Sequence, residues 1–106
     1  MTVTYRISVY VPESHLEPVK EALFAAGAGR IGDYDHCCWQ TQGQGQFRPL
    51  EGSDPHIGEH GKVEVLSEYK LELVCDGDHI INAVQAMIEA HPYETPAYDV
   101  YQPLAL

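Results

Sequence analysis

The sequence predicts an α+β fold, a ferredoxin-like βαββαβ sandwich in which two helices lie on one face of an antiparallel sheet. Two observations carry this prediction. Residues 3–11 and 63–75 alternate apolar and polar side chains with the period of two that a half-buried strand requires. Residues 16–26 and 80–88 instead repeat apolar side chains at the spacing of an amphipathic helix. Two further strands complete the order strand, helix, strand, strand, helix, strand.

The first strand is expected over 3–11, and Pro12 breaks its pattern. The helix that follows has two candidate starts. Ser14 and Glu17 have the spacing of a capping box, but Pro18 would then remove the first internal hydrogen bond. A start at Glu17 would instead place Pro18 at the first helical position, where proline is well tolerated. Both starts therefore remain open.

The second strand is expected over 34–42, because aromatic residues occur within it and glycines flank it, although its alternation is poor. The next segment, Gly43 to Gly61, is rich in glycine, proline and polar residues. This composition predicts a long loop outside the core. Long ordered loops often carry function, so this loop is a candidate for part of a binding site.

The third strand, over 63–75, has the clearest alternation in the chain. Residues 76–78, Asp-Gly-Asp, supply a turn and a helix cap, and the apolar stripe of the second helix runs on until His91 and Pro92 stop it. A short last strand is expected over 98–101. With 106 residues, the chain is expected to form one domain over 1–106.

Composition narrows the classes of function. No apolar run approaches the roughly 18 residues that span a bilayer, and the N-terminal sequence has no secretory signal pattern, so a cytoplasmic protein without membrane contact is expected. A formal charge of −10 with scattered lysines and arginines makes nucleic acid an unsuitable partner. Three cysteines without CxxC spacing indicate reduced thiols rather than disulfides.

Four residues are candidate ligands for a divalent metal, copper or zinc. His91 and Glu94 flank a rigid turn in which an imidazole and a carboxylate lie close together. His36 and Cys38 would share one face of the expected second strand and could complete a soft-metal site with them. A structural alternative stays open: His91 caps the second helix, Glu94 accepts backbone N–H groups, and the cysteines are small buried residues.

A small-molecule site is expected where the 43–61 loop meets the turn at His91. Its candidate residues are Gly43, Gly45, Phe47 and Tyr93. The glycines do not form a phosphate-binding loop, because no lysine follows them and no helix begins there. They also allow a sharp turn that returns Phe47 to the core or to a neighbouring subunit. Three glutamates of the third strand, Glu64, Glu68 and Glu72, are interpreted as solvent or subunit-interface charges rather than an acid–base pair.

Several separated motifs resemble the YqfO-type domain of the Nif-three-like proteins, also named GTP cyclohydrolase I type 2 homologues. They are residues 27–37 (Gly-Ala-Gly-Arg-Ile-Gly-Asp-Tyr-Asp-His-Cys), 43–49 (Gly-Gln-Gly-Gln-Phe-Arg-Pro), 55–58 (Pro-His-Ile-Gly), 64–72 and 91–94 (His-Pro-Tyr-Glu). Asp33 departs from the Gly-Asn-Tyr form of the first motif. The resemblance implies a fold similar to PII proteins and CutA, a trimeric assembly, and an accessory or sensory role, with the metal ligands of the parent proteins in another domain.

The function expected from these observations is a non-catalytic, trimeric regulatory module that binds a small ligand or a divalent metal. Two alternatives stay open. One is a metal-dependent hydrolase acting on nucleotide-like substrates, which would use the four candidate metal ligands. The other is a docking partner of a separate dinuclear-metal protein.

Overall fold

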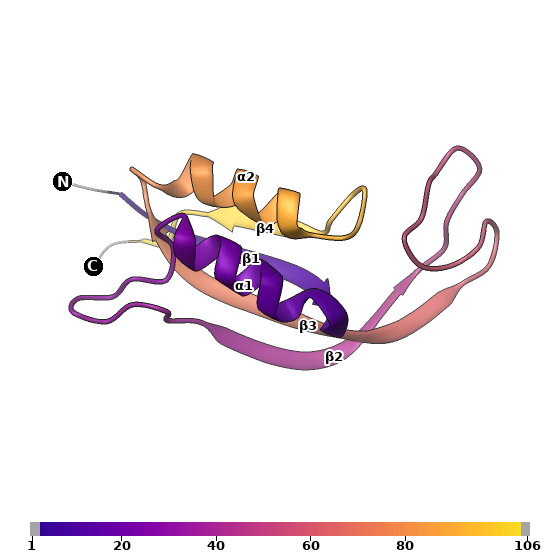
Figure 1. Cartoon of the computed structure of the whole chain (residues 1–106), viewed down its shortest axis with the longest axis horizontal. Coiled ribbons are helices and arrows are strands. Elements are labelled where there is room, and N and C mark those ends of the chain that lie inside the picture. Colours follow the sequence, from indigo (N-terminus) through magenta and orange to yellow (C-terminus); the bar gives the residue numbers. More distant parts are fainter. Residues whose placement is uncertain (1–2, 105–106) are drawn as a thin grey trace.

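The computed structural model describes residues 3–104. Its elements are β1 (Thr4–Pro12), α1 (Leu16–Ala25), β2 (Trp39–Phe47), β3 (Glu64–Asp76), α2 (Ile80–Ala90) and β4 (Tyr98–Tyr101) (Figure 1). The four strands form one sheet in the order β2-β3-β1-β4, and each neighbouring pair is antiparallel. This is the arrangement of a ferredoxin-like sandwich, so the fold class predicted from the sequence is confirmed.

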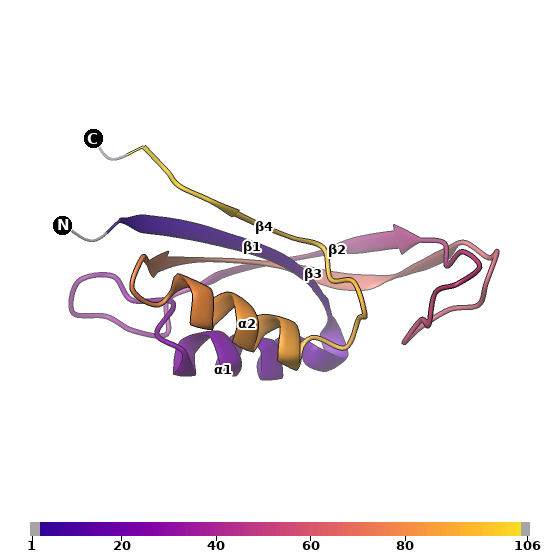
Figure 2. The same ribbon diagram turned by 90° about the horizontal axis from the view of Figure 1, so that it is seen from above.

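Both helices lie on the same side of the sheet (Figure 2). The core forms between the helices and the alternating apolar residues of the two central strands, as the period-two pattern requires. Its fully or almost fully buried members include Ile7, Val9, Leu71, Leu23 and Met87. Each such side chain stabilises the fold by about 1.5–3 kcal/mol relative to an exposed position.

The first helix begins where neither candidate start predicted it. A short 3-10 turn, Glu13–His15, leads directly into α1, whose first residue is Leu16. Ser14 makes no capping hydrogen bond to the backbone, because its hydroxyl is bonded to Nδ1 of His15 at 2.8 Å. Pro18 lies in the first turn of the helix, where backbone N–H groups have no intrahelical partner, so it removes no helical hydrogen bond.

The second strand lies five residues later than the sequence predicted. Residues 27–38 form an irregular loop instead, with a tight turn bridged between Ile31 and Tyr34 and a left-handed backbone at His36 (φ 55°). The strand itself runs through the glutamine- and glycine-rich segment up to Phe47. It pairs with β3 along its whole length, and this pairing satisfies the backbone groups that face β3 and overrides the weak intrinsic strand preference of the segment.

The pairing of β2 with β3 builds an arm that extends beyond the helices, and the molecule measures 48 × 25 × 24 Å (Figure 1). Because Gly43 and Gly45 belong to β2, the loop between these strands covers residues 48–63 rather than 43–61. The remaining boundaries lie within one or two residues of the predictions. In the described range 3–104, neither helix has the length and apolar character needed to cross a bilayer.

Candidate functional site

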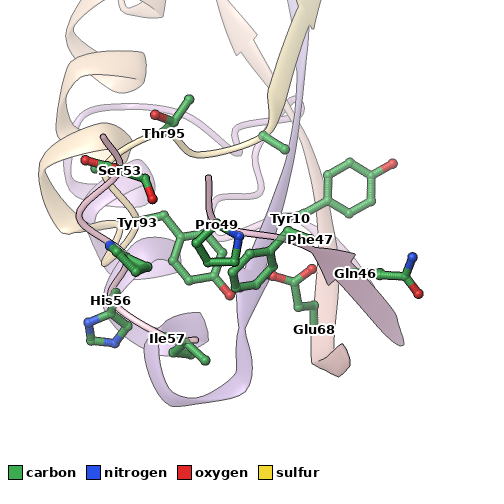
Figure 3. Close-up of a pocket in the computed structure, with 13 residues that line it drawn as sticks. Tyr10, Gln46, Phe47, Pro49, Ser53, His56, Ile57, Glu68, Tyr93 and Thr95 are labelled. Atoms are coloured by element: carbon green, nitrogen blue, oxygen red, sulfur yellow. Dashed lines mark hydrogen bonds between the residues drawn. The ribbon is translucent and has the colours of Figure 1, made fainter. Parts of the chain in front are cut away.

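A pocket of about 250 Å³ opens where the β2–β3 arm, the 48–63 loop and the turn after α2 meet. It is lined by Tyr10, Gln46, Phe47, Pro49, Ser53, Pro55, His56, Ile57, Glu68, Tyr93, Glu94, Thr95 and Ala97. Most of these side chains are apolar or aromatic, and a few polar groups lie among them (Figure 3). This composition is typical of small-molecule sites.

The turn that forms one wall is held by His91. Pro92 stops α2, and the imidazole of His91 is buried beneath the turn, with 6% of the residue exposed. Its Nε2 donates to the carbonyl oxygen of Tyr10 at 2.8 Å, while its Nδ1 accepts the N–H of Tyr93 at 3.2 Å. Burial lowers the pKa of His91, which favours this neutral tautomer. Both ring nitrogens are therefore engaged in holding the turn against β1.

The Tyr93 side chain reaches from this turn to the central strand β3. Its hydroxyl donates to Oε2 of Glu68 at 2.9 Å. Burial, followed by this hydrogen bond and the charge of Glu68, raises the pKa of Tyr93 well above its usual range. The phenol consequently stays protonated and remains a donor to a carboxylate that is only 9% exposed.

Glu94 connects the same turn to the 48–63 loop. Its Oε1 accepts the backbone N–H of Asp54 at 2.9 Å. Within the loop, the carbonyl oxygen of Ser53 is bonded to Nε2 of His60 at 2.8 Å. These contacts order a long segment that would otherwise be held only at its two strand ends, and they fix the opposite wall of the pocket.

Aromatic rings line the space between the two walls. The ring of Phe47 lies 5.9 Å from that of Tyr93, and the ring of His56 lies 6.4 Å from Tyr93. His56 also makes an edge contact with His15, at 5.6 Å between ring centres. Figure 3 shows Phe47 and Tyr93 beside Pro49, with Glu68 next to their rings. Such spacings are those of tilted and edge-on aromatic pairs, which hold rings in defined orientations.

Gly45 is required by the position of Glu68. A Cβ atom at residue 45 would occupy the space of the Glu68 carboxylate, whereas a Cβ at Gly43 would meet nothing within 4 Å. The absence of a side chain on β2 thus lets Glu68 lie across its neighbouring strand and reach Tyr93. Gly45 shapes the pocket from behind rather than lining it.

The structure separates the residues that the sequence analysis grouped. Phe47, Tyr93 and Glu94 line the pocket, but Gly43 and Gly45 lie on β2 behind it, and His91 lies beneath the turn. The expectation that His36 and Cys38 share a strand face is wrong, because both precede β2. The exposed His36 ring packs on Phe24, with ring centres 4.6 Å apart.

No group of three or more His, Cys, Asp or Glu side chains is placed to hold a metal ion anywhere in the described range 3–104. Of the four proposed metal ligands, His91 and Glu94 are bonded to backbone groups, and Cys38 lines a second hollow of about 200 Å³ beside the 27–38 loop. The structure does not bring these four side chains together.

The lining residues that the sequence did not assign to the ligand site include Tyr10, His56 and Glu68. Glu68 was interpreted as a solvent or interface charge, and its burial shows that the solvent reading is wrong. One signal of this burial was present in the sequence: a glycine-rich strand pairs with a strand that carries glutamates, and a glycine leaves room for a neighbour's side chain. The contact between Glu68 and Tyr93 gave no such signal, because 25 positions separate the two residues and no local pattern links them.

The fold is that of a CutA-like α+β domain, with a pocket at one end of its sheet. CutA from Xylella fastidiosa superposes with a TM-score of 0.69 over 97% of this chain and 86% of that protein, at 20% identity. GlnK from B. subtilis superposes with a TM-score of 0.61 at 14% identity. These identities establish a shared fold alone, and they confirm the predicted likeness to CutA and PII-like proteins.

Relatives with higher sequence identity match this chain to one segment of a longer protein. The chain is 46% identical over 101 residues to a GTP cyclohydrolase 1 type 2 homolog of Halalkalibacterium halodurans, covering 95% of this chain and 27% of that protein. A Bacillus cereus protein related to NIF3 superposes with a TM-score of 0.82 at 38% identity, over 97% of this chain and 26% of that one. No family model matches the sequence.

The chain is thus homologous to one segment of the GTP cyclohydrolase 1 type 2 homologs, the Nif-three-like proteins, and the resemblance inferred from its motifs is confirmed. It spans about a quarter of the length of the curated relatives it matches.

Proposed function

We propose that the chain is a non-catalytic module that binds a small ligand in the pocket between the 48–63 loop and the turn at residues 91–97. The observation that carries this proposal is the pocket itself, in which aromatic rings and a few polar groups converge. Its volume of about 250 Å³ is close to the lower end of the range typical of small-molecule sites, roughly 300–1,000 Å³.

Hydrogen bonds within the chain hold the walls of this pocket, which supports a binding role over a purely structural one. Hydrogen bonds from His91, Tyr93 and Glu94 connect the turn to β1, β3 and the loop. A site that is ordered in advance loses less conformational entropy on binding. A regulatory module gains from this arrangement, because a ligand that spans two walls can couple the loop to the body of the domain.

A fragment screen detected by ligand NMR tests the proposal, with Phe47→Ala as the decisive variant. Fragments that bind the wild type should lose most of their affinity when the Phe47 ring is removed. Tyr34→Ala is the matched control, because Tyr34 is an exposed aromatic residue outside the pocket. A screen without hits, or hits that Phe47→Ala leaves unchanged, would refute ligand binding at this site.

We further propose that the module is a trimer, as its resemblance to CutA and PII proteins implies. The sheet face opposite the helices carries Tyr10, Trp39 and Tyr101, which are 40%, 68% and 47% exposed. Exposed aromatic residues on an uncovered sheet favour an assembly that covers them. Light scattering should give three times the chain mass of 11.8 kDa, and Trp39→Asp should dissociate the assembly while Tyr34→Asp does not. A wild type that is monomeric at high concentration would contradict the assembly.

It stays a prediction that divalent copper or zinc is bound by His36, Cys38, His91 and Glu94. Metal analysis of protein purified without chelator tests it. The name of the relatives motivates the hydrolase alternative, but the chain spans only about a quarter of their length. Incubation with GTP and phosphoesters across divalent metals tests that activity, and co-purification with a dinuclear-metal protein tests the docking alternative.

A further inference from the structure

The charge distribution of the pocket defines the class of ligand. We propose that it takes a small organic cation with N–H donors on a flat or aromatic body, such as an amidinium, and that it disfavours phosphate-bearing ligands. This inference rests on the proposed function, because it specifies what the same pocket binds.

The first observation is the state of the Glu68 carboxylate. Glu68 is 9% exposed, and Oε2 accepts one hydrogen bond from Tyr93. Among the ion pairs within residues 3–104, none includes Glu68, and Oε1 has no hydrogen-bond partner there. Within the described residues no buried side-chain oxygen or nitrogen lacks a hydrogen-bond partner, so the partnerless Oε1 is accessible from the pocket that Glu68 lines. A carboxylate oxygen in this position can accept from an N–H donor of a bound cation.

The second observation is the lack of a compensating cation in the pocket wall. No lysine or arginine is among the residues that line it, while Glu94 adds a second carboxylate at the rim. His91 is held neutral because its Nδ1 accepts an N–H. Lys70 lies near the opening, 6.0 Å from the Tyr10 ring, but pairs with Glu72 at 3.6 Å. Arg48 is exposed and does not line the pocket.

The third observation is the aromatic surface around Glu68. Phe47 and Tyr93 lie next to the carboxylate, and His56 lies on the other side of Tyr93 (Figure 3). Aromatic faces attract cations, and they accommodate flat ligands with little loss of contact area. A phosphate would meet two carboxylates and no cationic side chain in the same space, so its desolvation would be uncompensated.

Three probes of matched size separate charge from shape: benzamidinium, benzamide and benzoate. Each is titrated into 15N-labelled protein at low salt and pH 8, where ordinary imidazoles are uncharged, and followed by the amide shifts of the pocket residues. We expect benzamidinium to bind about tenfold or more tightly than benzoate, with benzamide between them. Addition of salt should reduce this preference.

Glu68→Gln removes the charge and keeps an acceptor for Tyr93, so benzamidinium should bind this variant about as weakly as benzamide. Glu21→Gln is the control: it removes the same charge from an exposed position on α1 that does not line the pocket and belongs to no ion pair among the described residues. It should retain the cation preference. If Glu68→Gln does not fold, the order of the three probes on the wild type is sufficient.

Equal or tighter binding of benzoate would overturn the inference, and so would a failure of benzamidinium to shift any pocket amide. The proposed function would survive either result if hits from the fragment screen still depend on Phe47. If fragment binding no longer depended on Phe47, the proposed function itself would be refuted.

Discussion

The hydroxyl of Tyr93 donates to Oε2 of Glu68 at 2.9 Å, across 25 positions of the chain. This contact joins the turn after α2 to the middle of β3, and it passes over Gly45 of the neighbouring strand. Three segments of the chain therefore meet at one carboxylate. The shape of the pocket and its charge both depend on this contact.

Tyr93→Phe should reduce the free energy of unfolding by about 1–3 kcal/mol, because it leaves a nearly buried carboxylate without its donor. Urea denaturation measures the change. Tyr98→Phe is the control, since the Tyr98 side chain is exposed on β4 and its loss of a hydroxyl should cost less than about 0.5 kcal/mol. Equal stability of Tyr93→Phe and the wild type would show that the hydrogen bond contributes nothing to folding.

Gly45→Ala should reduce stability by about 1–3 kcal/mol, because the new methyl group displaces the Glu68 carboxylate from Tyr93. Gly43→Ala is a closely matched comparison. It adds the same methyl group two residues away on the same strand, where nothing lies within 4 Å. Its stability should be unchanged or slightly increased. Equal effects of the two substitutions, measured by thermal and urea unfolding, would argue against the close approach of Glu68.

Stability should fall as the pH drops below the ordinary imidazole value of 6.5. Burial lowers the pKa of His91 in the folded state, so between the two pKa values the unfolded chain binds a proton that the folded chain does not. The contribution is complete above pH 6.5 and is lost as the pH falls toward the folded pKa, at no more than about 1.4 kcal/mol per pH unit.

Urea denaturation from pH 8 to pH 5 measures this loss, and His91→Gln should show a shallower dependence than the wild type. Identical slopes would mean that His91 does not titrate differently in the two states. Asp76 does not interfere, because its lowered folded pKa and its ordinary value of 3.8 both lie below this interval.

Asp76→Ala should cost about 0.5–1.5 kcal/mol of stability by removing the side-chain hydrogen bonds that hold the turn leading into α2. Its Oδ1 accepts from the backbone N–H groups of Asp78 and His79 and is bonded to Nδ1 of His79. The pKa of Asp76 is lowered chiefly by that side-chain bond, so the loss should also develop in the wild type as the pH falls below 3.8. Asp33→Ala, at an exposed turn, serves as the control and should leave the unfolding midpoint unchanged.

Strong periodicity made most of the fold predictable from the sequence. The alternation that defines β3 and the apolar stripe of α2 reflect burial of one face, so their positions followed from side-chain chemistry alone. The strand β2 had no such pattern, since glutamine and glycine fill it and its stability comes from pairing with β3. Tyr34 misled the prediction, because it lies in an exposed loop before β2.

The site was predictable only in part. Phe47, Tyr93 and Glu94 stood out because they belong to unusual segments, and all three line the pocket. Glu68 did not, because a glutamate at a polar position of an alternating strand is usually exposed. Its burial arises only when the distant turn folds over it. The expected shared strand face of His36 and Cys38 was wrong, because β2 begins only at Trp39.

Soaking crystals of the protein with hits from the fragment screen would show directly whether ligands bind in the pocket. We expect fragments to occupy the space between Phe47, His56 and Tyr93, with the donor groups of cationic fragments directed at Glu68. Fragments that bind only at other surfaces, or a pocket that stays empty at saturating concentrations, would contradict this expectation.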